Sequence, residues 1–196
     1  VEVDAEPVGD GTSRVTLVGY DYPGELSLIC GLLFAYGFSI VDGNVFTYEP
    51  ATAGVNAAAR RKIVDVFTVQ PVGGSVDADT WAGYAVELSA LLRLMEHGSA
   101  QAESRGREAR IQIAKRVAAA LHAVTEAPQT LYPVDIEIDN DHSAHYTLLR
   151  IDAADTIGFL YELTNALAFS RVYIARVSVD SVGNRVRDTL WVTDAD

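Results

Sequence analysis

The chain has 196 residues, of which 49% are apolar, and it carries a formal net charge of −12 with a pI of about 4.6. An acidic surface repels phosphate backbones and anionic headgroups, so we expect no binding to nucleic acid or to membranes. The single cysteine, Cys30, excludes an intrachain disulfide. It is typical of a small buried core residue in a reducing, cytoplasmic compartment.

The first residues differ in composition from those that follow. Residues 1–13 are polar, acidic and glycine-rich, which predicts an N-terminal tail. Because the chain begins with Val1 and its only methionine is Met95, we expect it to be a piece of a longer protein. Residues 14–20 are rich in β-branched and aromatic side chains, and this composition predicts the first strand.

A helix and two strands are predicted next. Apolar residues recur at helical spacing through 24–37, and Gly37 stands where a helix C-terminus favours a left-handed residue. Residues 38–48 predict a second strand, interrupted by an Asp-Gly-Asn stretch, and the alternation of 62–70 predicts a third. Residues 49–60 between them are rich in alanine and glycine and predict a long hairpin loop.

Two helical patterns occupy the middle of the chain, at 79–97 and 102–124. The second pattern gathers five basic residues: Arg105, Arg107, Arg110, Lys115 and Arg116. In an acidic protein these residues form either a solvated helix face or a docking face for an acidic partner or a neighbouring domain.

The last third of the chain predicts mostly strands. Residues 134–139 place valine and isoleucine on one face and carboxylates on the other, as in a strand with one wet face. The remaining predicted elements are strands at 145–152, 171–180 and 185–193 and a helix at 158–169.

The two ends of the chain repeat one pattern in a fixed register. Gly24 precedes Ile40 by 16 residues, just as Gly158 precedes Ile174. The third strands align as well. Each copy reads strand, helix, strand, strand, which indicates a duplicated module.

The helical pair and the strand at 134–139 would extend the first copy to β-α-β-β-α-β, the ferredoxin-like order. We therefore expect an α+β fold of two ferredoxin-like modules, with antiparallel sheets and helices on one face. The first module spans 14–141 and has an expanded helical pair at 79–124. The second module spans 144–196 and is incomplete, because its pattern stops after the third strand.

These residues resemble the ACT domain family, whose small βαββαβ modules bind amino acids and regulate enzymes. The matching features are Asp21-x-Pro23-Gly24 at the first strand–helix junction, FSIVDGNVFT and VDVFTV. The pair looks most like the tandem ACT modules of the PII uridylyltransferases and glutamine synthetase adenylyltransferases of nitrogen regulation. That likeness rests on VDIEIDND, FLYELTNAL and GNRVRDTLWVTD in the second half.

The Asp-x-Pro-Gly junction suits a carboxylate ligand at the helix N-terminus, which favours an anion. Pro23 has no N–H to lose at a first helical position, and Gly24 has no Cβ, so backbone or ligand can approach closely. We expect Asp21 to accept hydrogen bonds from free helix N–H groups, and we include Tyr22 and Glu25 in the site. A well-capped tight turn without a ligand is the alternative interpretation.

An amino acid also offers an ammonium group, which Asp21, Asp42 or backbone carbonyls could accept, and Asn44 could read a side-chain amide. The Asp-Gly-Asn stretch is alternatively a bulge in an edge strand. The second module carries Asp155 and Gly158 at the equivalent junction. It lacks the proline, which predicts a less rigid loop.

Other site chemistry is sparse. We interpret Asp65 and Asp188, which occupy equivalent positions, as strand residues on a wet face. His142 and His145 favour a solvated turn over a metal site. The sequence contains no Ser-His-Asp, Cys-His or phosphate-loop pattern and no nucleotidyltransferase signature. We therefore expect no catalytic residues, no metal and no cofactor in this chain.

The resemblance implies an amino-acid-sensing regulatory module, with glutamine favoured, of a nitrogen-metabolism nucleotidyltransferase. The catalytic machinery would then lie elsewhere in the parent chain. A homodimer through sheet edges or helices is expected, because an incomplete module leaves an edge strand open to pairing. The alternative is a ligand-free dimerisation or scaffold module.

Overall fold

The computed structural model describes residues 1–48, 61–73, 76–77, 79–96, 102–123 and 134–194. Within these ranges eight strands form one sheet: β1 (Glu2–Gly9), β2 (Thr12–Tyr20), β3 (Phe38–Tyr48), β4 (Lys62–Pro71), β5 (Asp135–Asp139), β6 (Thr147–Ala154), β7 (Val172–Val182) and β8 (Arg185–Asp194). The helices of the described ranges are α1 (Glu25–Ala35), α2 (Thr80–Leu94), α3 (Ala102–Ala123) and α4 (Phe159–Phe169). The predicted loop at 49–60 lies outside the described residues.

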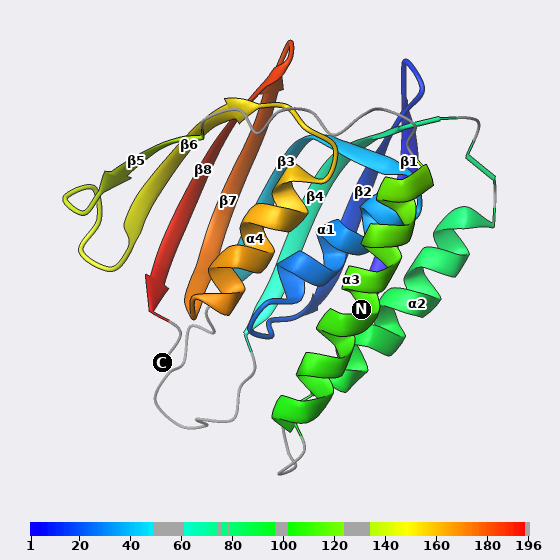
Figure 1. Cartoon of the computed structure of the whole chain (residues 1–196), viewed down its shortest axis with the longest axis horizontal. Coiled ribbons are helices and arrows are strands. Elements are labelled where there is room, and N and C mark those ends of the chain that lie inside the picture. Colours follow the sequence, from blue (N-terminus) through cyan, green and yellow to red (C-terminus); the bar gives the residue numbers. More distant parts are fainter. Residues whose placement is uncertain (49–60, 74–75, 78, 97–101, 124–133, 195–196) are drawn as a thin grey trace.

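The sheet is antiparallel throughout, in the order β1-β2-β4-β3-β7-β8-β6-β5. Figure 1 shows the four helices on one face of this sheet, with the other face left uncovered by them. The predicted α+β class, with antiparallel strands and helices on one face, is therefore confirmed. The arrangement is consistent with tandem ferredoxin-like ACT modules. No helix in the described part of the chain is both long and apolar enough to cross a membrane.

The two halves meet where β3 pairs with β7, and they are related by an approximate two-fold axis. Asn44 lies opposite Ser178, and each of these residues is 20 positions after the junction glycine of its own half, Gly24 or Gly158. The second strand of one module thus pairs with the second strand of the other. This pairing places each strand–helix junction beside the opposite module.

The N-terminal tail prediction was wrong, because residues 2–9 form β1 and pair with β2. Val3 and Ala5 pack against the core, whereas Glu2, Asp4 and Glu6 between them are exposed. The alternation typical of a half-buried strand was present in the sequence, but the acidic composition masked it.

The assignment of 134–139 to the first module was also wrong. These residues form β5, which pairs with β6 in a hairpin at the far end of the sheet. β1 takes the corresponding place beside β2 in the first half. The second half is incomplete only in its helices, since α4 alone covers it among the described residues. Ile136 and Ile138 of β5 consequently remain 53% and 63% exposed.

Helix α1 lies at the centre of the helical layer and packs against α2, α3 and α4. Every residue from Glu25 to Phe34 is buried, which explains why α1 is apolar on nearly all sides. Helix α2 covers the first half through Trp81, whose ring stacks on Phe38 at 4.5 Å between centroids. Contacts from α1 to α4 join the helices of one half to the helix of the other.

Gly31 permits the close approach of α1 to α4, and replacing it tests that packing. A Cβ at Gly31 would lie 2.7 Å from the ring of Tyr161 and 3.2 Å from Ile113. We expect Gly31→Ala to lower the free energy of unfolding by about 1–3 kcal/mol through overpacking. Gly106→Ala is the matched helical control, because no described atom lies within 4 Å of its Cβ position. It should raise stability by up to about 1 kcal/mol. Urea unfolding measures both, and a neutral Gly31→Ala would contradict the packing.

Candidate functional site

The Pro-Gly of the first junction forms a type II turn. The backbone N–H of Glu25 donates to the carbonyl of Tyr22 at 3.0 Å, and Gly24 has φ 86° and ψ 10°. Proline at the second position and glycine at the third are the residues this turn requires. Helix α1 begins at Glu25, so the prediction that Pro23 occupies the first helical position was wrong. Glycine is required at position 24 because the backbone there has a positive φ.

The second junction repeats the turn without proline. The N–H of Phe159 donates to the carbonyl of Thr156 at 3.0 Å, and Gly158 has φ 81° and ψ 5°. Ile157 stands where Pro23 stands in the first copy. The missing proline therefore leaves the shape of the turn unchanged.

Asp21 does not cap α1, contrary to the expectation from the sequence, because no side chain caps this helix. One of its carboxylate oxygens instead accepts a hydrogen bond from the Tyr173 hydroxyl at 2.9 Å and pairs with Arg61 at 2.9 Å. The Arg61 guanidinium also lies 4.5 Å above the Tyr173 ring. Asp21, Arg61 and Tyr173, which we call the latch, thus tie the first junction to β7 of the other half.

Glu25 turns back toward the junction. Its carboxylate accepts the backbone N–H of Tyr22 at 3.1 Å and is buried. Burial raises the pKa of Glu25 well above its usual value, and the neighbouring Asp21 and Asp65 raise it further. Three carboxyl groups therefore gather beneath the first turn.

Asp65 and Asp188 are buried under the helices, so their interpretation as wet-face residues was wrong. Each is 1% exposed, and neither carboxyl has a hydrogen-bond partner among the described residues. Burial raises the pKa of Asp65 to about 8. The nearby backbone of Phe46 lowers this pKa in part, although it makes no hydrogen bond of ordinary geometry to the carboxyl group. Burial likewise raises the pKa of Asp188 to about 7, and the nearby backbone of Asp180 lowers it in part, again without a hydrogen bond of ordinary geometry.

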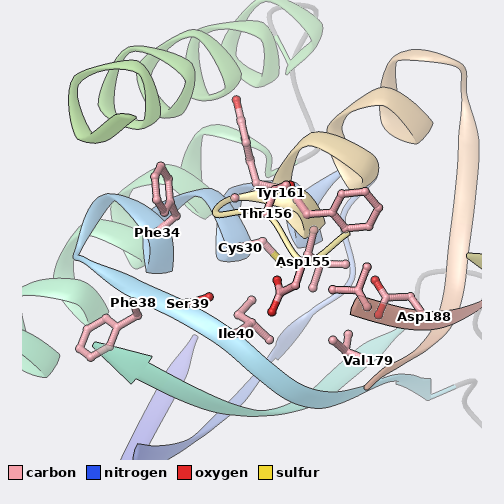
Figure 2. Close-up of a pocket in the computed structure, with 14 residues that line it drawn as sticks. Cys30, Phe34, Phe38, Ser39, Ile40, Asp155, Thr156, Tyr161, Val179 and Asp188 are labelled. Atoms are coloured by element: carbon pink, nitrogen blue, oxygen red, sulfur yellow. The ribbon is translucent and has the colours of Figure 1, made fainter. Parts of the chain in front are cut away.

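Two cavities lie where the halves meet, one at each junction. The first junction cavity has a volume of about 70 Å³ and combines the Pro23–Ser27 segment with residues of α3, α4 and β7. The second junction cavity, drawn in Figure 2, has a volume of about 30 Å³. It combines Asp155–Gly158 residues of one half with Phe38, Ser39 and Ile40 of the other. Both therefore depend on the approximate two-fold axis.

The two cavities differ in charge. Arg110 of α3 and Arg171, just before β7, line the first together with Glu25, and an Arg110 guanidinium nitrogen lies 3.9 Å from the Cβ position of Gly24. Asp155 and Asp188 line the second, and burial raises the pKa of Asp155. Ser39 stands at the position equivalent to Tyr173, so the second junction lacks the latch tyrosine. The first cavity therefore offers arginines to a carboxylate group, whereas the charged groups that line the second are all acidic.

The structure does not bring Asp42 and Asn44 to either junction. Strand alternation turns them away from the helices, since Gly43 between them faces the core residue Phe67. Asp42 lies opposite Asp180 on β7. A register shift between Ile40 and Asp42 gives the predicted bulge, although β3 is a central strand and not an edge.

The paired histidines lie in the β5–β6 loop. They belong to a turn in which the backbone N–H groups of Asp141 and His142 donate hydrogen bonds to the carboxylate of Asp139. Among the described residues no cluster of three or more His, Cys, Asp or Glu could hold a metal ion. Sequence reasoning missed Arg61, Arg110 and Tyr173, because only the fold brings these distant residues beside the first turn.

Sequence comparison finds relatives that share most of this chain. It is 31% identical over 179 residues to a bifunctional uridylyltransferase/uridylyl-removing enzyme of Cereibacter sphaeroides, covering 89% of this chain and 16% of the relative. It is 28% identical over 197 residues to the enzyme of that name from Gluconobacter oxydans, and the match covers 99% of this chain and 18% of that relative. The enzyme of that name from Ruegeria pomeroyi is 28% identical over 200 residues, and the match covers 99% of this chain and 19% of that relative.

The chain thus spans less than a fifth of the length of these relatives. No family model matches it. No solved structure matches it either.

Asp65→Asn should flatten the dependence of stability on pH. Because the folded pKa of Asp65 is about 8 and an unfolded Asp titrates near 4, the folded state holds this proton more tightly. The contribution of this group to the free energy of unfolding is fully present below about pH 4 and is lost as the pH rises toward 8. The total loss is on the order of 5 kcal/mol. The variant should be more stable than the wild type at pH 8. Urea unfolding from pH 4 to 9 measures this, with exposed Asp42→Asn as the control; identical pH profiles would refute the assignment.

Tyr173→Phe removes the latch hydroxyl while keeping the ring beneath Arg61. Losing its hydrogen bond to the Asp21 carboxylate should lower the free energy of unfolding by about 1–3 kcal/mol. Tyr48→Phe provides the control, because Tyr48 is 70% exposed. Equal stabilities of the two variants would mean that the latch contributes nothing to the closed junction.

Proposed function

We propose that this chain is an amino-acid-sensing regulatory module of a bifunctional uridylyltransferase/uridylyl-removing enzyme, with glutamine as the first ligand to test. The relatives are enzymes of that name, and their likeness to this chain covers most of its length. The observation that carries the proposal is the first junction cavity, where two arginines and Tyr173, the hydrogen-bond partner of the Asp21 carboxylate, come together at the meeting point of the two halves.

The first junction cavity offers partners for both ends of an amino acid. Arg110 and Arg171 would bind the carboxylate, together with the N-terminus of α1, whose first turn no side chain caps. The ammonium group would bind Asp21, which lies behind the lining residue Tyr173 as its hydrogen-bond partner. The second carboxylate oxygen of Asp21 is buried without a hydrogen-bond partner in the described structure.

Ligand binding requires the halves to part. A cavity of about 70 Å³ holds roughly two water molecules, which is less than the volume of an amino acid. The Tyr173–Asp21 hydrogen bond crosses the same junction and holds it closed. A ligand would therefore favour a more open arrangement, and it would shift the parent enzyme only by its difference in affinity for the two arrangements.

Asp155 and Gly158 hold the equivalent place at the second junction, where the surroundings are acidic. The carboxylate of an amino acid finds no arginine or lysine there among the described lining residues. We therefore assign the amino acid to the first junction alone. Asp42 and Asn44 have no part in this site.

A ligand-free dimerisation or scaffold module is the second candidate. It is favoured by the uncovered apolar residues of the second half, where Ile138 is 63% exposed and Phe169 at the end of α4 is 71% exposed. The free edge of β5 offers backbone groups to another strand. In this case amino acids would leave stability unchanged, and the chain would sediment as a dimer.

Thermal unfolding with each of the twenty amino acids at millimolar concentration tests the proposal. A ligand at 100 times its Kd adds about 2.7 kcal/mol, which should raise Tm by roughly 5–10 °C for a chain of this size. Arg110→Gln should abolish the shift. Arg105→Gln, exposed on the same helix, should leave it intact. A response to no amino acid, or equal losses in both variants, would overturn the proposal.

A further inference from the structure

The second junction cavity has a buried carboxyl group with nothing to bind. Asp188 is 1% exposed, both of its oxygens are without a hydrogen-bond partner in the described structure, and it lines this cavity. A buried acceptor without a partner costs stability. Asp65, its counterpart in the repeat, is just as buried but does not line either junction cavity. Asp188 alone of the pair is therefore placed to meet a bound species.

The lining of this cavity offers oxygen atoms. Figure 2 shows Asp155, Thr156 and Ser39 around it with Asp188, and these residues supply two carboxyls and two hydroxyls. No arginine, lysine or histidine is among the lining residues described. The only charged groups are acidic, and the cavity therefore favours a positively charged occupant.

The size and the number of ligands select the kind of cation. A volume of about 30 Å³ equals the share of one water molecule in the liquid. The described residues contain no cluster of three or more His, Cys, Asp or Glu that could hold a metal ion, and this counts against Ca²⁺, with its six to eight oxygen ligands, and against potassium alike. We propose that the second junction cavity binds one small monovalent cation, ammonium, between Asp155 and Asp188.

The cation would join the two halves. Ser39 and Ile40 at the start of β3 belong to the first half, whereas Asp155 and Asp188 belong to the second. An ion held between them stabilises the closed arrangement of the junction. This inference is independent of the amino-acid proposal, because it concerns the other junction and different residues.

Protons compete with the cation for the same carboxyls. The titratable groups near Asp188 are Asp155 of the β6–α4 turn, Asp180 of β7 and Cys30 of α1, whereas the side chain of Tyr161 points away from it (Figure 2). Because burial raises the pKa of Asp188 to about 7, the cation must displace a proton near neutral pH. Its affinity should rise about tenfold from pH 5 to pH 6 and level off above about pH 8.

Thermal unfolding of this chain in NH₄Cl, KCl and tetramethylammonium chloride at equal concentration tests the inference. At ten times its Kd, ammonium should raise Tm by roughly 3–6 °C more than potassium, for which the cavity lacks ligands, and more than tetramethylammonium, which is too large for the cavity. Asp188→Asn should abolish this difference. Asp65→Asn, the equivalent buried position outside the cavity, should keep it.

A second measurement on the unaltered chain does not depend on how the variants fold. Calorimetry in two buffers of different ionisation enthalpy should show about half a proton released per cation at pH 7. Equal Tm values in the three salts, no proton release, or an ion effect retained in Asp188→Asn would each overturn the inference. An Asp188-dependent shift with glutamine but not with ammonium would also overturn it, and would assign the carboxyls to the amino group of an organic ligand.

Discussion

The pairing of β3 with β7 is the interaction on which the rest of this structure depends. It joins two repeated modules into one sheet and fixes their register, with Asn44 opposite its own counterpart Ser178. Because the register is fixed, the turn before each helix comes to lie against the end of the helix in the other half. Without that pairing Asp21 could not reach Tyr173, and neither junction cavity would exist.

The sequence predicted the elements and the repeat well, since both depend on local periodicity. The helix from 24 to 37 and the strand from 62 to 70 were placed within a residue or two of α1 and β4. The strand partners were harder, because pairing is not a local property. Residues 134–139 were recognised as a strand but were assigned to the first module, following the ferredoxin-like order. In the structure they pair with β6, to which a short loop connects them.

The site was predictable only where it is local. Pro23 and Gly24 are turn residues, and the turn lies where the sequence placed it, although its type II geometry gives glycine a conformational role as well as a steric one. The burial of Asp65 and Asp188 was missed, because alternation shows that two residues share a face and leaves open which face is covered. Arg110 depended on how α3 crosses the first junction, and no spacing in the sequence encodes that crossing.

The replacement of Tyr173 by Ser39 at the equivalent position has a consequence for how such a chain can evolve. Two identical modules that meet as separate molecules must present the same chemistry at both junctions, because one gene encodes both surfaces. Joining the modules in one polypeptide removes that identity. Each junction can then drift toward its own chemistry while the shared strand pairing is preserved. A single chain can in this way acquire two inputs of different chemistry without changing its architecture.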